Sequence, residues 1–196
     1  MRVFGLTGQT GAGKSTVASF LSKKGFFVLD GDKIARLVTE KGSAALSELC
    51  AAFGNDILFE DGTLNRKKLA ERAFASKKNT ALLNKITHPY IDALFKNELK
   101  KAENAGFAFA LIDAAALLES PSKALCEKII AVLCPLEIRL ERILRRDGLT
   151  KEEALRRINA QKDEEYYKKN ADIIIRNYPP FDVQSEAESF LKEVGQ

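Results

Sequence analysis

The sequence has few of the residues that mark disulfide-rich, zinc-binding or membrane-spanning proteins. Its 196 residues include three cysteines and one histidine, and no two cysteines have CxxC spacing. This odd, scattered set favours buried thiols in a reducing compartment over disulfides or zinc. The longest apolar run, 107–118, is interrupted by Asp113 and is too short to cross a bilayer. Because a strand pattern runs directly into a loop at the start, without a secretory signal, we expect a cytoplasmic protein.

The chain also lacks a large excess of charge of one sign. The formal net charge is +4, from 31 basic and 27 acidic residues. This excess suits anionic small molecules and is too small to indicate nucleic acid binding. The length and the hydrophobic content of 45% fit one domain with a sizeable core, and no repeat or low-complexity linker divides it. The sequence does not determine the oligomeric state, and we expect a monomer.

The stretch GQTGAGKST, residues 8–16, matches the pattern G-x-x-x-x-G-K-[S/T]. Glycines allow positive φ and close approach, so successive N–H groups can form an anion cradle at a helix N-terminus. Lys14 supplies a charge for the terminal phosphates, and the Ser15 hydroxyl can bind Mg²⁺. The strand–turn–helix context disfavours an ordinary glycine-rich turn with a capping serine. We therefore expect a nucleoside triphosphate to contact Gly8, Thr10, Gly11, Ala12, Gly13, Lys14, Ser15 and Thr16.

Strand patterns alternate with helical patterns along the chain, which indicates an α/β protein with a parallel sheet and helices on both faces. The predicted strands are Val3–Leu6, Phe26–Leu29, Phe107–Ile112, Lys128–Leu133 and Asp172–Ile175. The crossover at about 32–106 is far longer than one helix requires and includes a long helix, Asn79–Asn104. It either forms a substrate-binding insertion or thickens the core. A second insertion is expected at about 139–169, which leaves a core of about 1–31, 107–138 and 170–196.

Acidic residues follow two predicted strands, at the edge where open α/β sheets bind ligands. Asp113 closes the third strand and is a candidate Mg²⁺ ligand beside Ser15, with a helix N-cap as the alternative. Asp30 ends the second strand, where a carboxylate is costly unless it is used. We therefore predict that Asp30 is the general base for an attacking hydroxyl. Asp32 has a competing role as the N-cap of the helix containing IARLV.

Six arginines lie in the second insertion, on two predicted helices joined by DGLT: Arg139, Arg142, Arg145, Arg146, Arg156 and Arg157. The first, second and fourth share one helix face. Arginine forks suit phosphoryl transfer, so we expect a lid that closes over ATP, although nearby glutamates also fit a solvated surface. The only histidine, His88, precedes a proline ahead of the long helix. A lone histidine is more often a packing or capping residue than a catalyst, and its HP pair is a weak sign of a substrate wall.

Together these motifs resemble those of dephospho-coenzyme A kinases over nearly the whole chain. The similar segments are GLTGQTGAGKSTVA, DGDKIARLV, FGNDILFEDGTLNRKKLAERAF, LNKITHPYI, RLERILRRDGLTKEEALRRINAQ and ADIIIRN. DAAALLE is a departure, because Ala114–Ala116 contains alanines where the family usually has a proline and a leucine. Gln9 stands where the family often has glycine, and Asn177 is followed by Tyr178 and two prolines instead of a glycine.

The resemblance implies a P-loop kinase-like three-layer sandwich with a five-stranded parallel sheet, an inserted helical acceptor domain and an arginine-rich lid. It implies phosphorylation of the ribose 3′-hydroxyl of dephospho-coenzyme A by ATP with Mg²⁺. Lys14, Asp30 and Arg142 would then be catalytic, with Arg142 or a neighbouring lid arginine stabilising the transferred group. Asn177 would join the ATP site, and the acceptor would contact Asp32, Arg66, His88, Leu117, Arg157 and Gln161.

Two rival functions remain at this stage. One is another small-molecule or nucleotide kinase of the same fold. The other is a P-loop ATPase or nucleotide switch, which the sequence disfavours because it has no N-K-x-D motif. Ala114 also follows Asp113 where many ATPases have a glutamate that activates water.

Overall fold

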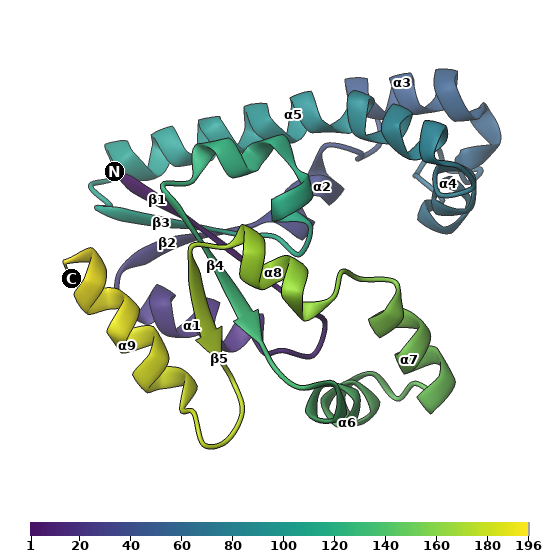
Figure 1. Cartoon of the computed structure of the whole chain (residues 1–196). Coiled ribbons are helices and arrows are strands. Elements are labelled where there is room, and N and C mark those ends of the chain that lie inside the picture. The colour runs from purple at the N-terminus through teal and green to yellow at the C-terminus, as the bar shows by residue number, and fades with distance from the viewer. Residues whose placement is uncertain (196) are drawn as a thin grey trace. The chain divides into compact units, whose positions relative to one another are not determined.

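The computed structural model describes residues 1–195 and divides into two compact units (Figure 1). The core unit combines Met1–Asp30 with the chain from Lys101 onward, and the helical unit is Gly31–Lys100. Within the described residues, no helix has the length and apolar character that a bilayer crossing requires.

A five-stranded parallel sheet forms the centre of the core unit and confirms the predicted fold class. Its strands are β1 (Arg2–Gly8), β2 (Phe26–Asp30), β3 (Phe109–Asp113), β4 (Lys128–Leu133) and β5 (Ile173–Arg176), in the order β2-β3-β1-β4-β5. β3 begins two residues later than predicted because Phe107 belongs to the end of the preceding helix. Its N–H donates to the carbonyl of Ala102, and Gly106 has the positive φ of a helix C-terminus.

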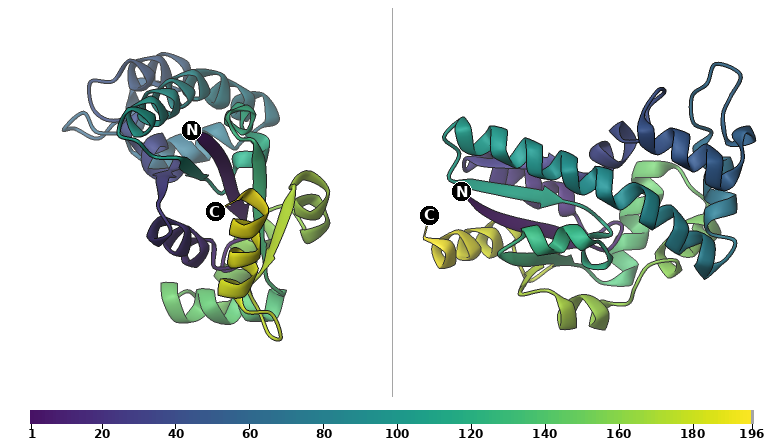
Figure 2. Two further views of the ribbon diagram at one scale, coloured as in Figure 1. Left: turned by 90° about the vertical axis from the view of Figure 1, so that its left-hand side faces the viewer. Right: turned by 90° about the horizontal axis from the view of Figure 1, so that it is seen from above.

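One face of the sheet is covered by α1 (Lys14–Lys23) and α9 (Val183–Val194) (Figure 1). Phe4, Phe26 and Phe190 are at least 98% buried there, and their rings pack with centroids 5.3–6.1 Å apart. Burial of each such side chain contributes roughly 1.5–3 kcal/mol. Arg2 donates to the carbonyl of Val194, so β1 starts near the end of α9 (Figure 2).

The other face of the sheet carries η2 (Leu117–Glu119), η3 (Pro121–Leu125) and α8 (Glu164–Asn170). Leu117 is fully buried against β1, where the absence of a side chain on Gly5 makes room for it. The helices therefore form layers on both sides of the sheet.

The arginine-bearing helices are α6 (Leu136–Asp147) and α7 (Lys151–Asn159). A short turn joins them: Gly148 adopts a positive φ at the end of α6, and Thr150 caps α7 in a reciprocal capping box with Glu153. Ile143, Ala154 and Ile158 are buried between the two helices. This pair of helices has its own small apolar core.

The helical unit consists of α2 (Gly31–Leu37), α3 (Ala44–Phe53), η1 (Asn55–Ile57), α4 (Arg66–Ala73) and most of α5 (Lys77–Asn104). Two local predictions were wrong here. α2 already begins at Gly31, so Asp32 lies in its first turn instead of capping it. His88 lies inside α5, within the predicted range Asn79–Asn104 and not ahead of a helix as its HP pair suggested. Pro89 removes one helical hydrogen bond, but buried Ile86 and Phe95 on either side keep the helix continuous.

Candidate active site

The phosphate-loop motif connects β1 to α1 at the carboxyl edge of the sheet. Gly13 is the N-cap residue of α1 and has φ 94°, a conformation that L residues rarely adopt. A Cβ on Gly13 would also overlap the amide nitrogen of Asn177. At Gly11, a Cβ would lie 2.8 Å from the carbonyl oxygen of Arg139. The structure therefore requires glycine at both positions, as the motif does.

The backbone N–H groups of this loop are of two kinds. Three of them donate to acceptors within the protein, namely those of Thr10, Ala12 and Thr16. In the described part of the chain, the other N–H groups between these positions have no protein acceptor: Gly11, Gly13, Lys14 and Ser15. They are clustered at the helix N-terminus, where such groups bind anions. The loop thus has the donors of a phosphate cradle.

Lys14 and Asp113 form an ion pair at the mouth of the loop. Lys14 is the first residue of α1, and Asp113 is the last residue of β3. Asp113 is in register with Leu6 on β1 and with Asp30 on β2. Adjacent strands are about 4.8 Å apart and paired residues point to the same face. The side chains of Asp30 and Asp113 therefore lie next to each other on one face of the sheet, and Asp113 contacts Lys14 of the loop.

Arg142 and Asn177 hold the carbonyl groups of the loop. The Arg142 guanidinium donates to the carbonyls of Gly11 and Ala12 at 3.4 and 3.3 Å and to that of Asn177 at 3.0 Å. The Asn177 side-chain amide donates to the Ala12 carbonyl at 2.8 Å. In this structure both predicted site residues therefore bind the loop backbone and fix the conformation that presents the free N–H groups.

The segment that follows α7 also binds the loop. The side-chain oxygen of Gln161 accepts from the Thr10 N–H at 2.6 Å, and Gln9 donates to the Lys162 carbonyl at 3.3 Å. Gln9 is 4% exposed. The sequence analysis assigned no role to Gln9, because the motif allows any residue there and gives no signal. The structure brings it together with Gln161 behind the loop.

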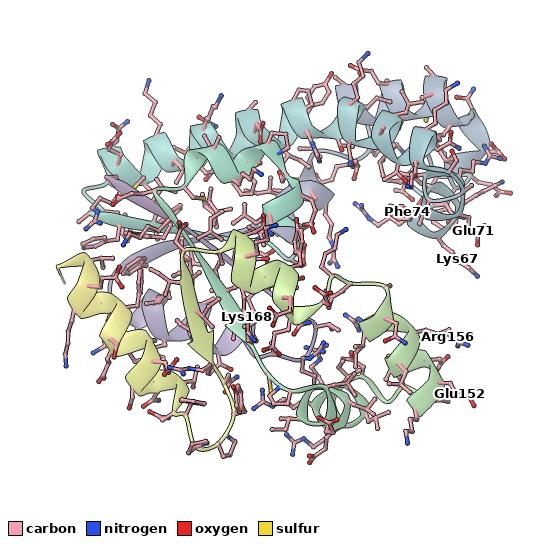
Figure 3. All side chains as sticks on the ribbon, viewed as in Figure 1. Lys67, Glu71, Phe74, Glu152, Arg156 and Lys168 are labelled. Carbon is pink, nitrogen blue, oxygen red and sulfur yellow. The ribbon has the colours of Figure 1, made fainter. Side chains whose placement is uncertain are left out.

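The six arginines of the lid motif have different environments. Arg139 lies on α6 at helical spacing from Arg142 and Arg146, but it is only 5% exposed and donates to the Cys134 carbonyl. Burial lowers the pKa of this guanidinium. Arg146 and Arg157 both pair with Asp147. On α7, Arg156 and Glu152 project outward (Figure 3).

Three of the remaining predicted acceptor residues lie in the helical unit, whereas Leu117 lies in η2 of the core unit and is fully buried. Asp32 is exposed in the first turn of α2, and His88 is half-buried within α5. Arg66 is the first residue of α4, and its guanidinium donates to the carbonyl of Arg36. The sequence analysis assigned no role to Arg36, which is thirty residues away from Arg66 in the chain.

The oxygen atoms of Ser15 and Asp113 are the expected Mg²⁺ ligands. Among the described residues, no three histidine, cysteine or acidic side chains gather into a metal-binding cluster. Magnesium bound with nucleotides keeps waters and phosphate oxygens and needs only one or two protein ligands. The hydroxyl of Ser15, on the first turn of α1, and the carboxylate of Asp113 have the hard-oxygen chemistry that fits this ion.

Comparison with known proteins decides between the kinase families of this fold. The dephospho-CoA kinase family profile matches residues 2–180. A dephospho-CoA kinase of Corynebacterium glutamicum is 41% identical over 191 residues, which cover 97% of this chain and 96% of the relative. This chain belongs to the dephospho-CoA kinase family.

Solved structures agree with this family assignment. A dephospho-CoA kinase from Campylobacter jejuni is 29% identical, with a TM-score of 0.69, and the match covers 99% of this chain and 98% of that one. The crystal structure of TT1252 from Thermus thermophilus has a TM-score of 0.86 at 29% identity, covering 100% and 98% of the two chains. The fold of a dephospho-CoA kinase thus extends along the whole described chain.

Proposed function

We propose that this protein transfers the γ-phosphoryl group of ATP to the ribose 3′-hydroxyl of dephospho-coenzyme A, yielding coenzyme A and ADP. The observation that carries the proposal is the phosphate loop with unpartnered N–H groups, set in a chain that the family profile matches from residue 2 to residue 180. Such a loop binds polyphosphates in general, and the family membership specifies the reaction.

ATP binding is assigned to the loop and its supports. The free N–H groups of Gly11 and Gly13–Ser15 receive phosphate oxygens, and Lys14 exchanges Asp113 for the β- and γ-phosphates. Ser15 and Asp113 would hold Mg²⁺, which would supply positive charge beside the phosphate oxygens. Arg142 and Asn177 keep the loop rigid through its carbonyl groups. This rigidity preserves the donor geometry during transfer.

Asp30 is assigned as the base that accepts the proton of the acceptor hydroxyl. The hydroxyl oxygen forms a bond to the γ-phosphorus, the bond from that phosphorus to the β–γ bridging oxygen breaks, and ADP leaves. The register that places Asp30 beside Asp113 supports this assignment, because the proton acceptor then lies next to the phosphate site. Transfer itself requires cationic groups next to the negatively charged oxygens of the transferred phosphoryl group. Lys14 supplies that charge, and we assign the remaining part to an arginine of α6 or α7.

The helical unit is assigned to the acceptor through Asp32, Arg66 and His88. The segment of about 139–169 is assigned as a lid over ATP. Arg157 and Gln161 of this segment are assigned to contacts with the acceptor. Leu117 is fully buried against β1, so we assign it to the packing of η2 on the sheet of the core unit. We further propose a monomer in the cytoplasm, where both ATP and the acceptor are available.

A coupled assay of ADP release, with and without dephospho-coenzyme A, tests this function. We expect ADP to form only with the acceptor and in a one-to-one ratio with coenzyme A, identified by its mass. A panel of nucleosides, nucleotides and shikimate serves as the control for other kinases of the fold. ADP release that does not depend on any acceptor would contradict the kinase assignment and favour an ATPase.

A further inference from the structure

Two arginines of the helical unit lie together although thirty residues separate them in the chain. Arg36 lies in the last turn of α2, and Arg66 begins α4. A guanidinium nitrogen of Arg66 donates to the backbone carbonyl of Arg36 at 3.2 Å. Both side chains are exposed. The contact places the guanidinium of Arg66 next to the backbone of Arg36.

The backbone around Arg66 is fixed by several independent hydrogen bonds. The N–H of Asn65 donates to the carbonyl of Ile57 at 2.8 Å, and the Asn65 side chain caps α4 by accepting from the N–H of Lys68. Lys41 donates to the carbonyl of Asp61 in the turn that precedes α4. Arg66 is therefore presented by an ordered turn.

The Arg36 side is fixed in a similar way. The hydroxyl of Thr39, a residue that is 5% exposed, donates to the carbonyl of Arg36 at 3.1 Å. The N–H of Thr39 donates to the same oxygen at 3.2 Å. Arg66 is a third hydrogen-bond donor to this oxygen. The end of α2 and the start of α4 are therefore joined at the carbonyl of Arg36.

The charges of these two arginines are not neutralised by a carboxylate. Elsewhere on α4, Lys68 and Arg72 both pair with Asp56. In the part of the chain that the structure describes, neither Arg36 nor Arg66 forms an ion pair. Partial burial of the mostly exposed Arg66 and the charge of nearby Arg36 lower the pKa of Arg66, and the charge of Glu40 only partly opposes this effect. Two adjacent cations of this kind repel each other until an anion lies between them.

We propose that Arg36 and Arg66 form a diphosphate-binding subsite of the helical unit. Paired guanidiniums present several N–H donors in planar forks, which match neighbouring phosphate groups. The proposal rests on the proposed function for its ligand: dephospho-coenzyme A contains a diphosphate between its adenosine and its pantetheine arm. Binding of that diphosphate places the acceptor by its phosphates and leaves the ribose hydroxyl free to react.

The test measures binding while a non-hydrolysable ATP analogue with Mg²⁺ fills the phosphate loop. Inorganic pyrophosphate and dephospho-coenzyme A are then titrated by calorimetry into the wild type, Arg36→Gln and Arg66→Gln. We expect each substitution to weaken binding of both probes by about 10–100-fold, as for charge-assisted hydrogen bonds. The affinity for the ATP analogue should not change. Arg36→Gln is the decisive variant, because the carbonyl that accepts from Arg66 belongs to the backbone and stays in place.

Lys67→Gln is the matched control, since it removes a charge from the next position of the same helix. Lys67, Glu71 and Phe74 project from one side of the α4 segment (Figure 3), at the helical spacing i, i+4, i+7. We expect binding in this variant to stay within about threefold of the wild type, as for exposed charges. The subsite is overturned if Lys67→Gln matches Arg36→Gln, if Arg36→Gln binds normally, or if the wild type does not bind pyrophosphate. If pyrophosphate binding depends on Arg36 but dephospho-coenzyme A is not phosphorylated, the subsite stands and the proposed function fails.

Discussion

The phosphate loop and the proposed subsite of Arg36 and Arg66 present hydrogen-bond donors in different ways. In the core unit, the donors are backbone N–H groups of one continuous loop, residues 8–16, between β1 and α1. In the helical unit, they are the side chains of Arg36 and Arg66, which a tertiary contact brings together. A backbone cradle fixes residue types at fixed spacing, whereas a side-chain pair only requires two cations that meet after folding. A single side-chain substitution can therefore remove half of the arginine pair but leaves most donors of the backbone cradle. For the same reason the cradle can be recognised from sequence and the pair cannot.

Replacement of Lys14 by alanine should have the largest effect, because it removes the only side-chain cation of the loop while the backbone cradle remains. We expect turnover to fall by about 10²–10³-fold, as when one preorganised transition-state donor is lost. The affinity for an ATP analogue should fall much less. Initial rates and equilibrium titration measure the two quantities separately. Near-normal turnover would refute the assignment of the loop, and a thermal melt of the variant controls for folding.

The substitution Asp30→Asn separates proton transfer from positioning. It preserves size and hydrogen bonding but cannot accept a proton, so we expect turnover to fall by at least roughly 10²-fold, with nearly unchanged ATP affinity. The lower end of the usual range applies because little proton transfer has occurred in a loose phosphoryl-transfer transition state. Asp32→Asn, in the first turn of α2, is the matched comparison. A larger loss in Asp32→Asn would move the base to that residue.

The contrast between the regions also explains what could be predicted from sequence. The sheet and the phosphate loop follow from local patterns, namely apolar strands and glycines at fixed spacing. His88 was misplaced because a proline usually marks a helix boundary, while the packing of Ile86 and Phe95 overrides it here. Helical spacing groups Arg139 with Arg142 and Arg146, but it does not show that the Arg139 side chain is buried and bound to the Cys134 carbonyl. Arg36 lies in DGDKIARLV, one of the segments similar to the family, but its contact with Arg66 had no local signal because thirty residues separate the two.

A pair of glycine substitutions tests whether the cradle depends on tertiary contact as well as on backbone conformation. Gly13 and Gly106 both have positive φ, at 94° and 87°. In Gly106→Ala the new Cβ meets no atom within 4 Å, so the free energy of unfolding should fall only by the cost of positive φ in an L residue, about 1–2 kcal/mol. Gly13→Ala should lose about 1–3 kcal/mol more, because the Cβ displaces Asn177. Urea unfolding measures both losses, and equal values would show that Asn177 moves away freely.

Hydrogen exchange tests whether the phosphate loop is coupled to the arginine-bearing helices. Gln161 and Lys162 bind the loop at Thr10 and Gln9, so nucleotide binding should slow amide exchange across residues 139–161. The amides of α3 in the helical unit serve as the internal control and should not change. Unchanged exchange in residues 139–161 would mean that this segment does not act as a lid over the nucleotide.

The smallest effect is expected at Asp56, and it distinguishes the neutralised cations of the helical unit from the free arginine pair. Hydrogen bonds from Arg72 and Lys68 lower the pKa of Asp56 from 3.8 to about 2. Because the folded-state pKa lies below the unfolded one, the stabilisation is complete above pH 3.8 and is lost as pH falls toward 2. Asp56→Asn should therefore be slightly less stable than the wild type at pH 7, and this difference should shrink between pH 4 and pH 2. Glu60→Gln removes an exposed carboxylate that has no ion pair within the described residues, and it serves as the control for loss of a charge. Denaturant unfolding at several pH values in low salt measures the difference, since salt screens exposed pairs.

A constant difference at all pH values would mean that Asp56 stabilises the unit through hydrogen bonds that asparagine also makes. In that case, charge would not distinguish Lys68 and Arg72 from Arg36 and Arg66.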